Sequence, residues 1–540
     1  MENSNLISPN GAPSAPPDGG NFDNASSVSH TGVKVFSSDA TVSGESYTSS
    51  ANAEHAILIS GGKVELSDVT VEKSGDDSGD SSDFYGTNAA IFAYNGAVVD
   101  ISDSNIETDG AHANAVFAYG GATINIENSS IATHADNSGG IMVTGGGIIN
   151  ADSLNVITDG NSAAAIRSDR GGGNINVTGG VYTTNGVGSP AIYSTASINA
   201  KEAMLISFAS EGVVIEGKNS VTLENVTLDA TNNSLNGQSE TYKSIFIYQS
   251  MSGDATEGEG AFSADNSIII TNKGDHFYVT NTKAQINLTG NVFVQNDETG
   301  AFLRVQAGAW GNAGSNGGDV YLNVLKQDVI GDIVADSIST VDFRMKESYF
   351  RGAITGEGNV KLTVSSDSVV VLTGDTHVSE LTNETSDNSN IYSNGYKLFV
   401  NGTEVAVNTD EAPESFLDEY CTADGNSCYD GAEISVETVE SASTTASENN
   451  SSFPTWGIVA IIVGAVILIG ALVTILVLQI RKQKKDIVHT DGSAEVTASN
   501  TSSTPVMPDE PRETDMSSKP QNYSSNNDVP PFSRPNDGMN

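Results

Sequence analysis

The residues best suited to chemistry stand in the stretch RSDRGGG, which contains Arg167, Asp169 and Arg170. Enzymes that cleave polysaccharides use carboxylates that converge on one strand face, or an arginine beside calcium-binding aspartates. A solvated corner between two strands is the simpler interpretation, and the sequence favours it. The seven His residues are scattered, and the chain has no HExxH, GxSxG, P-loop or Rossmann motif. We therefore expect no enzymatic activity and keep a polysaccharide lyase or hydrolase as the alternative.

Four acidic residues in the stretch GDDSGDSSD could hold calcium weakly through their carboxylate oxygens. They are Asp76, Asp77, Asp80 and Asp83. Their spacing differs from that of the EF-hand loop and from the repeated GGxGxD pattern of calcium-binding solenoids. The sequence favours a disordered, solvated loop here, and we expect no cofactor apart from such weakly bound Ca²⁺.

The chain has two cysteines, Cys421 and Cys428, separated by six residues that include the turn-forming Asp424-Gly425-Asn426. This spacing predicts a local disulfide formed outside the cell, and two free thiols are the alternative. No CxxC pair or Cys/His cluster points to zinc.

Charge and composition restrict both the partners and the fold. The 68 acidic and 24 basic residues give a net charge of −44, which excludes nucleic acid because phosphate binding requires clustered Lys and Arg. Aromatic residues make up 6% of the 540 residues, and 55 are Gly. Such a chain favours many thin apolar layers separated by turns, and a repeat architecture escapes the usual size limit of a single domain.

Two stretches 25 residues apart, AIFAYNG from Ala90 and AVFAYGG from Ala115, reveal an internal repeat. One apolar position recurs every 25 or 26 residues, and a nine-residue polar insert at 75–83 explains the single spacing of 34. The units begin at Ile57, Ile91, Val116, Ile141, Ile166 and Ile192. Further columns are Gly96, Gly121, Gly146 and Gly171 at a tight corner, then Val99, Ile124 and Ile149, and then Ile106, Ile131, Val156 and Val181.

Within a unit the apolar residues alternate, as in TINIEN and NINVTG, which predicts short strands with one face inward. Helical repeats would need a 3.6-residue period, and propeller blades need about 40 residues. The sequence therefore predicts an all-β, right-handed parallel β-helix over 31–405, with about 25 residues per rung. About fifteen rungs at a spacing of ~4.8 Å would form a rod on the order of 70 Å long.

Aromatic residues follow the same 25-residue period at Phe92, Tyr94, Phe117 and Tyr119. Stacking of neighbouring rungs places equivalent side chains next to one another. We expect inward packing or a purely structural ladder. An outward stack of Tyr94 and Tyr119 is the alternative.

Residues 456–480 are 25 consecutive residues without a charge, which is long enough for a helix that crosses a bilayer. Trp456 stands where an aromatic side chain would anchor at the interface, and a basic run follows the span. The basic residues are Arg481, Lys482, Lys484 and Lys485. The positive-inside rule then predicts a single-pass plasma-membrane protein whose N-terminal part lies outside. Ala460 and Gly464 form a small-xxx-small pair that could support a homo-oligomer.

The remaining segments are expected to be a disordered N-terminal segment (1–30), a membrane-proximal stalk with the Cys loop (406–455) and a disordered cytoplasmic tail (481–540). With this topology, some Asn-x-Ser/Thr sequons before the span should carry glycans. The sequons are at Asn24, Asn128, Asn176, Asn225, Asn232, Asn287, Asn383, Asn401, Asn449 and Asn450.

Three late stretches carry a family resemblance: SYFRGAIT (348–355), LTGDTHVSEL (372–381) and NGYKLFVNG (394–402). The region 50–405 resembles the passenger domains of bacterial autotransporter adhesins of the pertactin and AidA type. Autotransporters end in an outer-membrane barrel, whereas this chain has one predicted helix, a basic run and a tail. In that respect it is similar to β-helix adhesins on the surface of parasitic protists. FAYN at 92–95 matches an FxxN element of chlamydial polymorphic membrane proteins, without their paired repeats.

The resemblance and the predicted membrane span together imply a cell-surface adhesin. Its β-helix would contact a glycan or protein on host cells or sister cells, and weak contacts would sum by multivalency. Candidate contact elements are the loops that break the register, at 75–83, 231–243 and 251–262. A structural coat protein is the remaining alternative.

Overall fold

The computed structural model describes residues 28–235, 241–250 and 252–415. The chain divides into two units, Met1–Ala442 and Ser443–Asn540, and every described residue belongs to the first. The described part contains forty-four strands and one short helix, α1 (Asp80–Tyr85). Strand neighbours are parallel except in the final hairpin, so the described part of the chain is the predicted parallel β-helix.

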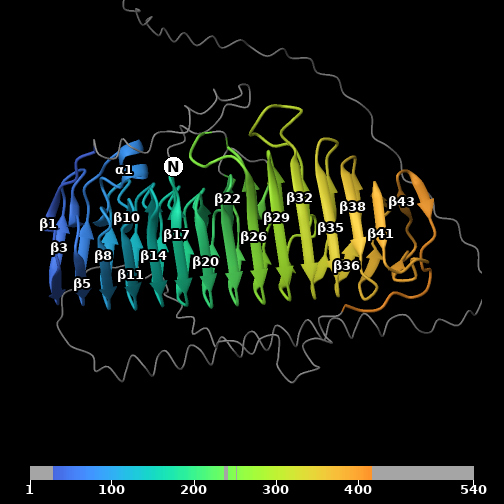
Figure 1. Cartoon of the computed structure of the whole chain (residues 1–540), viewed down its shortest axis with the longest axis horizontal. Helices are drawn as coiled ribbons and strands as arrows, with labels where there is room; N and C mark the ends of the chain where they lie inside the picture. The colour runs from blue at the N-terminus through green and yellow to red at the C-terminus, as the bar shows by residue number, and fades with distance from the viewer. Residues whose placement is uncertain (1–27, 236–240, 251, 416–540) are drawn as a thin grey trace, which may run out of the picture. The chain divides into compact units, whose positions relative to one another are not determined.

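Successive strands of each rung enter three different sheets, and equivalent strands of neighbouring rungs lie side by side (Figure 1). Sheet A contains β1 (Gly32–Phe36), β4 (His55–Ile59), β7 (Ile91–Ala93), β10 (Val116–Tyr119), β13 (Ile141–Thr144), β16 (Ile166–Ser168), β19 (Ile192–Ser194), β22 (Val213–Glu216), β25 (Lys243–Tyr248), β28 (Asp275–Thr280), β31 (Leu303–Val305), β34 (Ile333–Ala335) and β37 (Ile354–Gly356). Sheet B contains β2 (Ala40–Ser43), β5 (Lys63–Ser67), β8 (Val98–Ser102), β11 (Thr123–Glu127), β14 (Gly147–Asp152), β17 (Gly173–Thr178), β20 (Ser197–Lys201), β23 (Ser220–Glu224), β26 (Glu259–Asp265), β29 (Thr282–Thr289), β32 (Gly318–Leu325), β35 (Thr340–Lys346), β38 (Asn359–Val364) and β41 (Glu380–Asn383).

The third strand of each rung lies in sheet C, and the last rungs use two shorter sheets, D and E. Sheet C contains β3 (Ser46–Ser49), β6 (Thr70–Lys73), β9 (Asn105–Thr108), β12 (Ser130–Thr133), β15 (Asn155–Thr158), β18 (Val181–Thr184), β21 (Met204–Ser207), β24 (Thr227–Ala230), β27 (Ile268–Thr271) and β30 (Val292–Gln295). Sheet D contains β33 (Asp328–Ile330), β36 (Tyr349–Gly352), β39 (Val369–Leu372) and β42 (Ile391–Tyr392), and sheet E contains β40 (Thr376–Val378), β43 (Leu398–Val400) and β44 (Thr403–Val405).

The predicted register is confirmed by the strand pairing. Each predicted unit start pairs with the next, from Ile57 with Ile91 through to Ile166 with Ile192. One predicted column is wrong at its last member, because Val156 pairs with Tyr182 and Val181 pairs with Asn155. The extra residue in the Gly171–Gly173 corner shifts the following strands by one position, and Tyr182 therefore fills the interior site.

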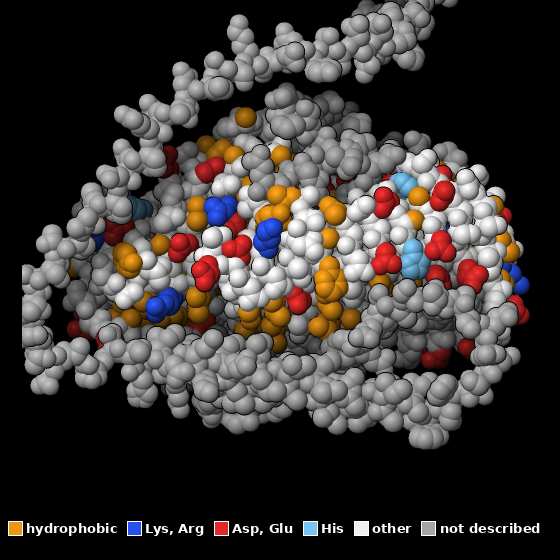
Figure 2. All heavy atoms as spheres, turned by 180° about the vertical axis from the view of Figure 1, so that it is seen from behind, with side chains coloured by type: hydrophobic (Ala, Val, Ile, Leu, Met, Phe, Trp, Pro, Cys, Tyr) orange, Lys and Arg blue, Asp and Glu red, His pale blue; other side chains and the backbone are white. Residues whose placement is uncertain are grey.

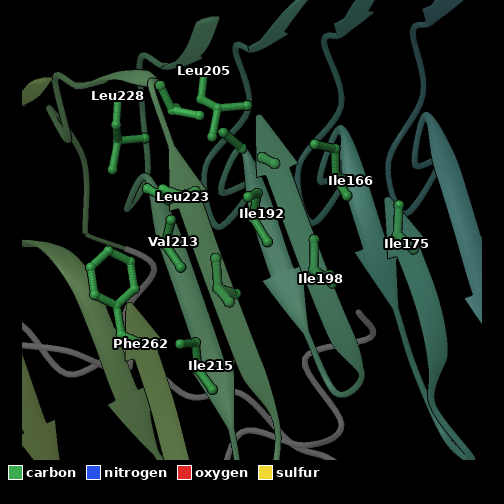
Figure 3. Packing of buried hydrophobic residues seen from close by; sticks show 14 of the residues in the cluster. Ile166, Ile175, Ile192, Ile198, Leu205, Val213, Ile215, Leu223, Leu228 and Phe262 are labelled. Atoms are coloured by element: carbon green, nitrogen blue, oxygen red, sulfur yellow. The ribbon is translucent and has the colours of Figure 1, made fainter. Parts of the chain in front are cut away.

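The interior is filled by apolar residues that alternate with exposed or half-buried ones along most strands of sheets B and C, whereas strands of sheet A such as β13 and β25 are buried at every position. In one rung Ile192, Ile198 and Leu205 come from sheets A, B and C and are all fully buried (Figure 3). Ala93 and Ala118, which are equivalent positions of neighbouring rungs, belong to the same continuous core. A single rung cannot bury its own faces, so stacking of rungs supplies the stability of the fold.

Corners are made by residues that tolerate positive φ. The predicted corner glycines Gly96, Gly121, Gly146 and Gly171 have φ between 68° and 83°. Sheet B leads to sheet C through another residue of positive φ, such as Asp103 (50°), Asn128 (48°) or Ser153 (55°). The Asn and Asp side chains among them tolerate this conformation better than other non-glycine residues.

The insert at 75–83 is an ordered cover over the outer face of sheet A, so the expectation of a disordered loop is wrong. It leads into α1, and the Thr144 hydroxyl donates to the Phe84 carbonyl oxygen at 2.7 Å. Beneath it, Phe92 and Phe117 are fully buried on the side of sheet A opposite the main core. The aromatic repeat is therefore mainly structural, and Tyr94 and Tyr119 pack at its margin.

Candidate functional site

The residues of the RSDRGGG stretch lie in a buried polar cluster on the outer face of sheet A. Arg167 continues the column of Phe92, Phe117 and Met142, and it is 1% exposed. Its Nη2 atom lies 3.6 Å from Asp83 Oδ1 and 3.4 Å from Asp169 Oδ2. The expectation of a solvated corner is wrong here, because the segment that carries α1 covers this column.

Arg170 joins the cluster to the chain that connects β25 and β26. Its Nε atom donates to Asp254 Oδ1 at 2.9 Å, and its guanidinium lies 3.8 Å from the centre of the Phe84 ring. The side chain of Arg170 is 35% exposed, and that of Asp254 is 4% exposed. Residues that are 84 positions apart in sequence therefore close over the same sheet.

A further carboxylate, Glu216, continues the cluster along sheet A. The Tyr193 and Tyr248 hydroxyls donate to Glu216 Oε2 at 2.6 Å and 3.0 Å. Ser250 also donates to Glu216, and Ser252 donates to Asp254 at 2.7 Å. These contacts attach the connection that follows β25 to the face of the sheet.

The environment separates the pKa values of the buried carboxyl groups. Burial, Asp254 and Asp83 raise the pKa of Asp169 to about 7, against the opposing charge of Arg167. Burial and Asp254 also raise the pKa of Glu216. Burial acts to raise the pKa of Asp83 too, but the hydrogen bond from His112 and the charge of Arg167 outweigh it and lower that pKa.

Carboxyl groups with opposed pKa shifts are the arrangement that acid–base enzymes use. Here Asp83, Asp169 and Arg167 are at most 5% exposed, and each already bonds to protein groups. A substrate would reach them only if α1 or the connection after β25 lifted from the sheet. The cluster therefore holds two covering segments in place.

Three of the four predicted calcium ligands bond to separate protein groups. Asp76 accepts from the Ala111 backbone N–H, Asp77 accepts from the Thr87 hydroxyl, and Asp83 contacts His112. Asp80 is the first residue of α1. Within the described ranges, the group able to hold a metal is instead Glu107, Asp109 and His134, which is exposed. His134 already lies 2.7 Å from Asp159.

An exposed ladder of Asn side chains runs along the outer face of sheet B and was missed from the sequence. Each amide nitrogen donates to the side-chain oxygen of the preceding rung, over distances of 2.7–3.1 Å. The bonds run from Asn125 to Asp100, from Asn150 to Asn125, from Asn176 to Asn150 and from Asn199 to Asn176. The sequence contains the signal as Asn at successive intervals of 25, 26 and 23 residues. One N–H and one oxygen lone pair of each inner amide remain for other partners.

The sequons differ in how accessible their amides are. Asn128 and Asn401 are exposed, Asn176 and Asn287 belong to sheet B, and Asn225 is half-buried at a corner. Asn232 is 1% exposed, and its Nδ2 donates to the Lys243 carbonyl oxygen at 2.6 Å. The Asn383 amide donates to both Asn388 and Asn390.

We expect glycans at Asn128 and Asn401, and none at Asn232, in folded full-length protein displayed on mammalian cells. A glycan at Asn232 would break a buried hydrogen bond and would have no route to solvent. Peptide mass spectrometry after enzymatic glycan release measures the occupancy of each sequon. A glycan on Asn232 in protein that still melts cooperatively would contradict this placement.

Several predicted residues lie outside the described part of the chain. These are the cysteines Cys421 and Cys428, the sequons Asn24, Asn449 and Asn450, and the predicted span 456–480 with Trp456, Ala460, Gly464, Arg481, Lys482, Lys484 and Lys485. Within 28–235, 241–250 and 252–415, no helix has the length and apolar character needed to cross a membrane.

No protein-family model matches the chain, and comparisons with curated proteins and with solved structures gave no match.

Proposed function

We propose that this protein is a cell-surface adhesin of the autotransporter-passenger type, anchored by one helix at 456–480. A parallel β-helix fits a surface or glycan-binding protein in general. The observation that carries the proposal is the exposed Asn ladder of sheet B. It repeats one donor and one acceptor at each rung, roughly every 4.8 Å. Such a face suits a partner with repeated polar groups, and many weak contacts then sum.

The anchor and the extracellular placement rest on the uncharged span and the basic run after it. On the face drawn in Figure 2, acidic side chains are scattered among fewer Lys and Arg side chains. This distribution favours uncharged partners over anionic ones. The Arg167 cluster is assigned a structural role in this proposal, since its groups are buried and paired with one another.

The test is attachment of cells that display the full chain to host cells or to sister cells. Deletion of 31–405 should abolish attachment. Asn125 and Asn150 replaced together by Val should reduce it several-fold, because two adjacent ladder positions lose their polar groups. The control replaces Asn105 and Asn155 of sheet C by Val; both are exposed, and they lie two rungs apart.

Attachment that is unchanged by deletion of 31–405 would eliminate the adhesin and favour a coat protein. Equal losses for the sheet B pair and the sheet C pair would contradict the assignment to the ladder face alone. Neither pair disrupts an Asn-x-Ser/Thr sequon, so glycan content stays constant across the variants.

A further inference from the structure

A groove lies between two long connections from sheet A to sheet B. The chain between β25 and β26 and the chain between β31 and β32 are long, whereas Asn281 alone connects β28 to β29. A short connection therefore stands between two long ones in adjacent rungs. The hollow between them has a volume of about 740 Å³ and is lined by Asn281 and by residues of both long connections.

The base of the groove is fixed by tight contacts. Asn281 has a φ of 52°, and its Nδ2 donates to the Gln249 carbonyl oxygen at 2.7 Å. A β-carbon at Gly311 would lie 2.1 Å from Asn281 Oδ1, so the second wall closely approaches this side chain. The groove is thus held by backbone contacts on both sides.

Gln249 lines the groove and is 4% exposed. Neither its Oε1 nor its Nε2 has a hydrogen-bond partner in the described structure. A buried carboxamide without partners is costly, by about 1–3 kcal/mol for each unsatisfied group. Rotation of this covered side chain toward the groove would let a ligand that offers both a donor and an acceptor remove that cost.

Apart from two glycines, the residues that line the groove have polar or charged side chains. Its residues are Gln249, Glu257, Gly258, Glu259, Asn281, Thr282, Lys283, Gly311, Asn312 and Ser315. No aliphatic or aromatic side chain is among them, so a peptide finds no apolar site in which to anchor a side chain. The lining contains two carboxylates, Glu257 and Glu259, and one cation, Lys283. The Lys283 Nζ lies 3.5 Å from Asp319 Oδ2. This excess of negative charge disfavours anionic ligands. Among the described residues, no group of side chains able to hold a metal ion lies at this groove.

We propose that this groove binds a neutral oligosaccharide. Carboxamides donate and accept at once, and so match a pair of neighbouring hydroxyl groups, while carboxylates accept from further hydroxyls. The site is separate from the Asn ladder of sheet B, so the inference goes beyond the proposed function. It gives the β-helix a discrete glycan site besides its broad polar face.

The experiment applies purified full-length protein to an array of neutral oligosaccharides, sialylated and sulfated oligosaccharides and unstructured peptides. Binding to neutral glycans is expected. The variant Asn312→Trp should weaken it at least tenfold by filling the groove, and Ala313→Trp, in the same wall but outside the lining, should leave it unchanged. Fluorescence of Trp310, next to Gly311, should shift on titration with a bound neutral glycan.

A second variant keeps the proposal testable if Asn312→Trp fails to fold. Glu257→Gln with Glu259→Gln preserves hydrogen-bonding groups, removes both charges and should raise binding to sialylated glycans. No binding to neutral glycans, capture of peptides instead, or equal losses for the two Trp variants would each overturn the site. If the protein binds no neutral glycan on the array but cells still attach, the groove site is rejected and the adhesin proposal stands. If the protein binds neutral glycans but cells do not attach, the adhesin proposal is rejected and the groove site stands.

Discussion

Replacing Arg167 by Met should lower the free energy of unfolding by about 3–5 kcal/mol, which is the cost of removing one partner of a buried ion pair. Methionine preserves most of the volume of the side chain but leaves Asp83 and Asp169 without their shared cation. The loss should be concentrated where the cover meets sheet A. Hydrogen exchange should therefore accelerate in α1 and in β16, beyond its increase in distant rungs.

The matched control is Arg344→Met in β35. Arg344 also pairs with an aspartate two positions away, Asp342, but its side chain is 55% exposed. An exposed pair contributes at most about 1 kcal/mol. Denaturant titration of both variants gives the comparison. Equal losses for the two variants, or a small loss for Arg167→Met, would mean that the cluster does not hold the cover in place.

The stacking of rungs could be predicted because it is periodic. Pairing of Val116 with Ile141 follows from a spacing of 25 residues, and the apolar alternation specifies which face turns inward. The Asn ladder has the same spacing from Asn125 through Asn150 to Asn176, so periodic polar residues predict it as periodic apolar residues predict the core. Tyr182 was missed because one extra glycine near Gly172 shifts the alternation without changing the composition.

The covered face of sheet A could not be predicted in this way. The insert at 75–83 is polar and acidic, and such composition indicates solvent exposure when it is considered alone. The burial of Asp83 at its end depends on contacts with His112 and Arg167, which are far away in sequence. Non-periodic contacts of this kind leave no local signal, so the polar cluster emerges only from the structure.

Replacing Asp169 by Asn should make the protein more stable at pH 8 and leave it nearly unchanged at pH 4. The pKa of Asp169 is about 7 in the folded protein, against an ordinary value of 3.8. Between those values the unfolded chain has lost this proton and the folded protein keeps it, so stability falls as the pH rises. The free energy of unfolding falls by up to about 1.4 kcal/mol per pH unit over this range, and the decrease is complete above pH 7.

In the wild type, the Arg170 backbone N–H donates to Asp169 Oδ1 at 3.0 Å. The Asn variant keeps an oxygen that can accept this hydrogen bond but no longer titrates. At pH 8 it should exceed the wild type by about 2–4 kcal/mol, as the one-proton linkage requires. A weaker slope should persist in the variant, because the pKa of Glu216 is raised as well. Denaturant titrations at pH 4, 6 and 8 measure the difference.

Asp152→Asn, at the exposed end of β14, is the control. Parallel pH profiles for the wild type and Asp169→Asn would show that Asp169 is already ionised in the closed cluster, and that Arg167 outweighs both burial and Asp254.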